Sequence, residues 1–145
     1  MCTLKPMMDL KKAIKLTISC PPVPWAAHAG YGRRAFNPRF REKKFCQWEI
    51  KNQYKGKVLT DPISMVLSFY MPIPKNTSKK KRLAMLEFKE YHTKKPDTSN
   101  LIKFIEDCLK TMVFSDDSQV YEIIAEKKYS EQPGTEIIIY PQGDL

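Results

Sequence analysis

The sequence is poor in the residues that would build a structural metal site or a disulfide framework. It has only two histidines, and its four cysteines are widely separated with no CxxC pair: Cys2, Cys20, Cys46 and Cys108. A zinc site is therefore not expected, and we interpret the cysteines as reduced thiols. No apolar run is long enough to span a bilayer and no signal-peptide core precedes the domain, so the protein is expected in the cytoplasm.

The chain does have an excess of positive charge. Its 25 lysines and arginines stand against 16 acidic residues, which gives a formal net charge of +9. Such a charge favours a polyanionic partner through counterion release, but it does not distinguish DNA from RNA, a membrane surface or heparin. With 42% apolar residues, a chain of 145 residues is expected to fold as one domain, residues 1–145, without disulfide support.

Hydrophobic periodicity predicts an α/β domain with a mixed β-sheet and flanking helices. Strands are predicted where apolar and polar residues alternate, and helices where apolar residues recur every three to four positions. In chain order, the prediction is a strand at 14–18, a long loop at 21–37, a helix at 39–54, a strand at 63–70, a short helix after the basic run 79–82, a helix from 98, and strands at 120–128 and 135–140. In the helix at 39–54, Phe45 and Trp48 are expected to be core anchors rather than base-stacking platforms.

The most informative segment, residues 95–120, reads KPDTSNLIKFIEDCLKTMVFSDDSQV. Pro96 discourages helix in the residue before it, and Thr98 and Ser99 are expected to cap the first turn of an amphipathic helix. Asp97 would then lie at the N-terminus of that helix. One face of the helix is predicted to pack against the core, and the other face is predicted to stay free.

Acidic residues stand at both ends of this helix. Asp97 precedes it, whereas Asp116 and Asp117 follow it, immediately before the strand at 120–128. If that strand runs beside the helix, Asp117 can return towards Asp97, and the resulting geometry could hold a divalent metal beside a phosphate. Neighbouring residues of an extended strand point to opposite faces, so Asp116 and Asp117 cannot both enter such a site unless the backbone bends between them.

This segment resembles the core motif of the RusA-type Holliday junction resolvases, or crossover junction endodeoxyribonucleases. That motif runs Pro-Asp-x-Asp-Asn-Leu-x-Lys, then a helix containing Asp, then Asp-Asp-x-Gln-Val. The matching residues, in register and without a gap, are Pro96, Asp97, Asn100, Leu101, Lys103, Asp107, Asp116, Asp117, Gln119 and Val120. Ser99 stands where the family has its second carboxylate. The resemblance implies a RusA-like fold and an intertwined homodimer.

The resemblance also implies a metal-dependent phosphodiester hydrolase. Asp97 and Asp117 would be catalytic and bind Mg²⁺, for which Mn²⁺ is expected to substitute. Ser99 would offer a hydroxyl or hold a metal-bound water without adding charge, so metal binding is expected to be weaker than in a three-carboxylate site. Asp116 is a further candidate ligand, and we favour Asp117 because the family motif places the catalytic acid there.

The polar face of the helix carries the remaining candidates. By the resemblance, Lys103 stabilises the phosphoryl charge of the transition state, and the alternative is a surface ion pair with Asp107. Asp107 is expected to have a structural or metal-supporting role, and Asn100 would orient a ligand or hold the helix start. Magnesium chemistry makes general-base roles for His28 and His92 unnecessary.

The implied partner is four-way junction DNA, bound by a homodimer, because paired nicks in a roughly twofold-symmetric junction require two symmetric sites. No membrane partner or small-molecule cofactor is expected. The candidate DNA contacts are Arg33, Arg34, Lys43, Lys44, Lys79, Lys80, Lys81, Arg82 and Lys95. Two alternatives stay open: a junction-binding protein with weakened or lost cleavage, and a small basic RNA-binding module that uses Trp25, Tyr31, Phe36 and Trp48.

Overall fold

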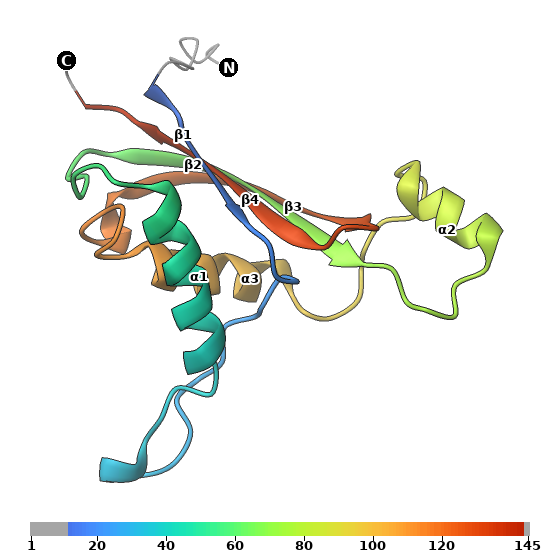
Figure 1. Cartoon of the computed structure of the whole chain (residues 1–145), viewed down its shortest axis with the longest axis horizontal. Helices are drawn as coiled ribbons and strands as arrows, with labels where there is room; N and C mark the ends of the chain where they lie inside the picture. Colours follow the sequence, from blue (N-terminus) through green and yellow to red (C-terminus); the bar gives the residue numbers. More distant parts are fainter. Residues whose placement is uncertain (1–11, 144–145) are drawn as a thin grey trace.

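The computed structural model of the chain describes residues 12–143, so Cys2 lies outside the described residues (Figure 1). The described residues form one α/β domain whose element order confirms the prediction from periodicity. In chain order the elements are β1 (Ile14–Ile18), the 3-10 turn η2 (Gly32–Arg34), α1 (Phe40–Gln53), β2 (Ile63–Pro72), α2 (Lys79–Leu86), α3 (Thr98–Leu109), the 3-10 turn η3 (Asp117–Gln119), β3 (Val120–Ser130) and β4 (Gly134–Pro141).

The strands form one mixed sheet in the order β1-β4-β2-β3. β4 is antiparallel to both of its neighbours, whereas β2 and β3 are parallel. At the centre of the sheet, Leu67 of β2 lies between Ala125 of β3 and Ile137 of β4. A parallel pair needs a long crossover connection, and the chain between β2 and β3 supplies it with α2 and α3. This crossover carries the motif segment up to Gln119, and Val120 begins β3.

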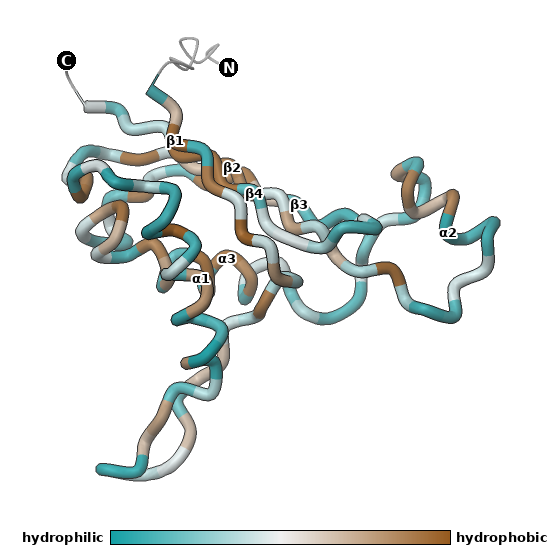
Figure 2. The backbone as a smooth tube through the Cα atoms, viewed as in Figure 1, coloured by the Kyte–Doolittle hydropathy of each residue, from teal (hydrophilic) through white to brown (hydrophobic). Residues whose placement is uncertain are grey.

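The core lies between one face of the sheet and the two helices α1 and α3, which cover the same side of it (Figure 1). Alternate residues of β2 point towards the helices, and Met65, Leu67 and Phe69 are almost completely buried. α3 contributes Leu101 and Cys108 from its apolar face, also without exposure. Figure 2 shows these hydrophobic segments gathered where the sheet meets the helices. The helix that carries the motif is therefore anchored along its length.

The prediction that Phe45 and Trp48 anchor the core is wrong. α1 instead buries Cys46 and Ile50, while the Phe45 and Trp48 side chains keep 42% and 60% of their surface exposed. Their rings stack on one another, with centroids 6.1 Å apart and planes at 29°. This leaves a pair of aromatic rings on the outer face of α1.

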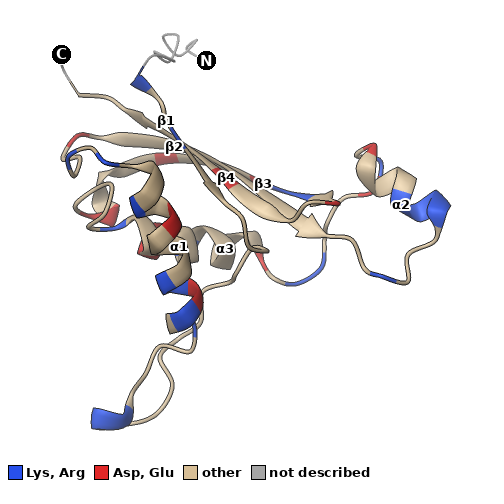
Figure 3. Cartoon of the chain, viewed as in Figure 1, with Lys and Arg blue, Asp and Glu red and all other residues tan. Residues whose placement is uncertain are grey.

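Two segments project from the body of the domain (Figure 1). One is the loop before α1, which narrows into a hairpin where Ala29 and Phe36 form an antiparallel bridge. The other is α2, which begins at the N-cap Ser78, whose hydroxyl oxygen accepts a bond from the amide of Lys81. Figure 3 shows lysine and arginine at the tip of the hairpin and in the first turns of α2. None of the helices within residues 12–143 combines the length and the apolar character needed to cross a bilayer.

Candidate active site

Asp97 is the N-cap residue of α3, so the helix begins at Thr98, and Thr98 and Ser99 lie inside its first turn rather than capping it. The Asp97 carboxylate makes no capping bond to the helix. It is exposed and accepts a hydrogen bond from Lys95 Nζ at 2.8 Å. This bond and the charge of Lys95 hold the pKa of Asp97 below its usual value. Asp97 is thus an ionised carboxylate open to solvent beside a lysine.

Lys127 of β3, which is not among the residues predicted from the sequence, supports the start of the motif. Its ammonium donates to the main-chain carbonyls of Lys94 and Pro96, both at 2.9 Å. Burial lowers the pKa of Lys127, while the nearby charge of Asp97 opposes that shift. A signal was present in the sequence, because the strand period places Lys127 on the same inward face as Ala125.

The polar face of α3 carries the next three candidates at intervals of four residues: Ser99, Lys103 and Asp107. This spacing aligns them along one side of the helix. Ser99 and Lys103 are exposed and Asp107 is half-buried. Within the described residues Lys103 forms no ion pair with Asp107, and its ammonium lies instead 3.4 Å from the centroid of the Trp25 ring.

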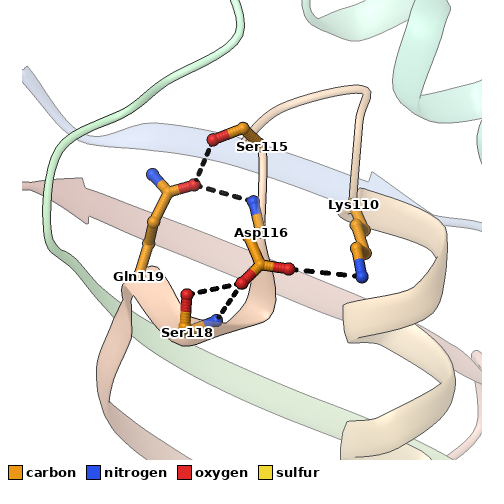
Figure 4. A network of polar contacts seen from close by, with 5 residues as sticks. All are labelled: Lys110, Ser115, Asp116, Ser118 and Gln119. Atoms are coloured by element: carbon orange, nitrogen blue, oxygen red, sulfur yellow. Dashed lines mark hydrogen bonds and ion pairs between the residues drawn. The ribbon is translucent and has the colours of Figure 1, made fainter.

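Asp116 is held within the turn that follows α3 (Figure 4). As the N-cap of η3, its carboxylate accepts bonds from the amide and hydroxyl of Ser118 and pairs with Lys110 Nζ at 3.3 Å. Gln119 returns a bond, because its side-chain oxygen accepts from the Asp116 amide at 2.8 Å. The contacts to Ser118 and Lys110 lower the pKa of Asp116. Most of its carboxylate is therefore engaged in holding the turn.

Asp117, by contrast, has a buried oxygen with no hydrogen-bond partner, Oδ1. Burial raises the pKa of Asp117, Lys110 opposes this, and the negative charges of Asp107 and Asp116 raise it further. Burial likewise raises the pKa of Glu106, to which Asp117 and Asp107 add repulsion. Glu106, Asp107 and Asp117 thus concentrate negative charge at the C-terminal end of α3.

This end of α3 fits a hard divalent cation, because a cation would supply the partner that Asp117 Oδ1 lacks and relieve the repulsion. Mg²⁺ prefers oxygen ligands and often takes one or two carboxylates, with waters and a substrate phosphate completing its shell. Among residues 12–143, no group of three or more His, Cys, Asp or Glu side chains is arranged to hold a metal ion. The fit is therefore that of a site with few protein ligands.

The two acidic positions of the motif do not meet within one chain. Lys127, near the end of β3, lies beside the N-terminus of α3, so β3 runs antiparallel to that helix. Asp117 consequently lies near the C-terminal end of α3 and Asp97 caps the other end. A helix of 12 residues is about 18 Å long at about 1.5 Å per residue. The expectation that Asp117 returns towards Asp97 is wrong for a single chain.

Apart from Lys95, the candidate DNA contacts fall on three segments of the fold. Arg33 and Arg34 lie at the hairpin tip, Lys43 and Lys44 on α1, and the run 79–82 in the first half of α2. The run is partly neutralised, because Arg82 pairs with Glu131 at 2.9 Å and Lys81 with Glu90 at 3.6 Å. Lys95 is engaged with Asp97.

The two histidines lie in different parts of the fold. His28 is exposed on the hairpin. The His92 ring packs against Tyr129 with centroids 4.8 Å apart, and its buried Nδ1 has no partner. Burial and the charge of Lys127 lower the pKa of His92.

The fold and the site together define a basic α/β domain that presents carboxylates and a lysine along one helix, an organisation suited to acting on nucleic acid. The model of the family described as "Endodeoxyribonuclease RusA" matches residues 26–140, and the chain belongs to this family. It is also 32% identical over 134 residues to "Uncharacterized protein YqaN" of Bacillus subtilis (strain 168). That similarity covers 87% of this chain and 94% of the relative.

Proposed function

We propose that this protein is a magnesium-dependent, structure-selective endodeoxyribonuclease that resolves four-way DNA junctions by paired symmetric nicks during recombination and repair. Membership of the endodeoxyribonuclease family supports the class of reaction. The observation that carries the metal dependence is the buried, unpartnered Oδ1 of Asp117 beside Asp107. Mn²⁺ is expected to substitute, since it also takes carboxylate and water ligands.

Asp117 and Asp107 are the residues that would hold the cation, and Asp116 contributes by fixing the turn. When bound, a divalent cation there would supply Lewis acidity towards a phosphate oxygen and an acidified water. Lys103, one helical turn before Asp107, adds a fixed positive charge along the same face, where it offsets the charge that develops on the phosphoryl group.

Asp97 and Lys95 give the other end of α3 a different role. Lys95 is highly exposed, so a DNA phosphate can replace the Asp97 carboxylate as the ion-pair partner of its ammonium. Asp97 would then be free to bind metal, with the Ser99 hydroxyl two residues further along the helix. The main-chain contacts of Lys127 hold this segment in place before DNA arrives.

A homodimer follows from the reaction. Resolving a junction requires two nicks in strands of like polarity, and a twofold-symmetric protein presents two equivalent sites to a substrate of similar symmetry. The formal charge of +9 on each chain doubles in such a dimer, which favours binding to several duplex arms.

A second candidate function is junction binding without cleavage. It is favoured by Ser99 at the family's carboxylate position and by the separation of Asp97 and Asp117 along α3. Both observations reduce the number of carboxylates available to one metal ion.

A cleavage assay on a synthetic four-way junction, with a linear duplex of equal length as control, tests the proposal. Symmetric nicks that need Mg²⁺ and occur in the junction alone are the expected result. Tight junction binding without nicks, at any Mg²⁺ or Mn²⁺ concentration, would favour the second candidate. Preferred binding of single-stranded RNA would contradict both and favour a small RNA-binding module.

A further inference from the structure

The hairpin of residues 26–37 is built to display one aromatic side chain. Its two sides are joined at Ala29 and Phe36 by backbone hydrogen bonds of 2.9 and 2.8 Å. At the tip, Tyr31 lies between Gly30 and Gly32, whose φ angles are +85° and +56°. A Cβ on Gly30 would meet the Arg34 carbonyl oxygen at 2.5 Å, so glycine is required there. Tyr31 keeps 94% of its surface exposed.

The charge around this tyrosine is of one sign. Residues 21–41 contain no Asp or Glu, and Arg33 and Arg34 lie in the turn directly after Tyr31. Both arginines are exposed, and Figure 3 shows the tip of the hairpin as a basic point well away from the body of the domain. An exposed aromatic ring between glycines and arginines does not contribute to the core. It suits a partner with both phosphates and flat apolar faces.

Exposed aromatic residues continue along the chain from the hairpin into α1. They are Tyr31, Phe36, Phe40, Phe45 and Trp48. Lysine is interleaved with them, since Lys44 Nζ lies 4.7 Å from the centroid of the Phe40 ring. Interleaved aromatic and basic side chains are typical of surfaces that bind unstacked bases beside a phosphate backbone.

We propose that the hairpin is a wedge that recognises the branch point of a DNA junction. Tyr31 stacks on the base-pair face, or on the unpaired base, that is exposed where the arms separate, and Arg33 and Arg34 bind the flanking phosphates. A continuous duplex exposes no base face along its length, so the ring contributes to binding of branched DNA alone. The inference rests on the proposed function for its DNA partner, and it assigns the recognition of branching to Tyr31.

The test compares Tyr31→Ala, Tyr31→Phe and the parent for equilibrium binding to a four-way junction and to a duplex of equal length, without divalent metal. Stacking of a base on an aromatic ring predicts a loss of about tenfold or more in junction affinity for Tyr31→Ala. Duplex affinity should be unchanged, and Tyr31→Phe should behave as the parent does. Tyr91→Ala is the matched control, because Tyr91 is also a highly exposed tyrosine, at 75%, and lies outside the hairpin.

A second measurement locates the ring. With 2-aminopurine at the branch point, the parent and Tyr31→Phe should change its fluorescence on binding, whereas Tyr31→Ala should not. The same probe in the middle of an arm should report no difference among the three proteins.

Several results would overturn the wedge. Equal losses on junction and duplex would make Tyr31 a general DNA contact, and a changed oligomeric state of Tyr31→Ala in size-exclusion chromatography would make the tip an interface between copies. If Tyr31→Ala keeps the parental preference for the junction over the duplex, the wedge proposal is wrong and the proposed function is unaffected. A parent that binds junction and duplex equally would overturn the proposed function together with the wedge.

Discussion

The Lys103 ammonium lies 3.4 Å from the centroid of the Trp25 ring, above its face. Trp25 is itself held in place, because its amide donates to the Asn100 carbonyl at 2.9 Å and its ring packs against the core. A lysine side chain has many rotamers, and a cation–π contact of about 0.5–2 kcal/mol restricts them. The loop before α1 therefore orients the lysine that the family resemblance assigns to transition-state stabilisation.

The first prediction concerns this pair. Trp25→Ala should lower the cleavage rate by about tenfold, since loss of a contact of about 1–2 kcal/mol frees the Lys103 ammonium. Trp25→Phe keeps an aromatic face and should retain most of the rate. Single-turnover kinetics with saturating enzyme separate this effect from DNA binding, which should change little. If Trp25→Ala cleaves as fast as the parent while Lys103→Met is inactive, the lysine does not depend on the ring.

The sequence predicted the strands and α3 well because alternation and helical spacing follow from burial on one face. It failed for α1, where two apolar pairs compete at similar spacing. Cys46 and Ile50 are buried in the core, whereas Phe45 and Trp48 are exposed. Helical spacing alone does not determine which of the two apolar faces packs against the sheet.

The site was predicted as a set of residues but not as an arrangement. Local sequence does not state whether a strand runs parallel or antiparallel to the helix before it, and this direction decides which residue lies beside Asp97. The structure places Lys127 there and leaves Asp117 at the far end of α3. The Trp25–Lys103 contact joins residues far apart in the chain, so no local sequence pattern predicts it.

The second prediction separates the two aspartates by stability. Because the pKa of Asp117 is raised, its contribution to stability is full below the unfolded pKa and is lost as pH rises through the folded pKa. Asp117→Asn, which resembles the protonated form, should therefore melt at a higher temperature than the parent at pH 7, and the gain should disappear near pH 3. Thermal melts followed by circular dichroism measure this.

Asp97→Asn is the matched comparison, with the opposite sign. The pKa of Asp97 is lowered, so its ionised form stabilises the fold above the unfolded pKa and this contribution is lost as pH falls. The variant should gain no stability at pH 7. Both variants should abolish cleavage yet bind the junction as tightly as the parent or more tightly. Cleavage at the parental rate under limiting Mg²⁺ would remove that aspartate from the site.

The third prediction uses salt. A basic dimer with about six or more phosphate contacts should lose about a thousandfold in junction affinity between 50 and 200 mM salt. Replacing residues 79–82 with Ala should flatten the slope of log affinity against log salt. The change should be less than four charges imply, because Lys81 and Arg82 already pair with Glu90 and Glu131. An unchanged slope would mean that this end of α2 is merely solvated.

The last prediction concerns Ser99, where this chain departs from its family. Ser99 is exposed in the first turn of α3, and no acidic residue occupies that turn. If its side chain faces a metal ion bound by Asp97, Ser99→Asp adds an anionic oxygen ligand, so half-maximal cleavage should need less Mg²⁺ and the maximal rate should rise. Because Asp97 is already the N-cap, the change should affect the free energy of unfolding only through the helix dipole, by about 0.3–1 kcal/mol.

Ser99→Asn is the matched control, since it changes size in the same way without adding charge. It should leave the Mg²⁺ midpoint where the parent has it. Titrating Mg²⁺ against cleavage rate for the three proteins then isolates the effect of the carboxylate from that of side-chain volume. A midpoint that is the same in Ser99→Asp and Ser99→Asn would mean that the side chain at position 99 does not reach a metal ion bound by Asp97.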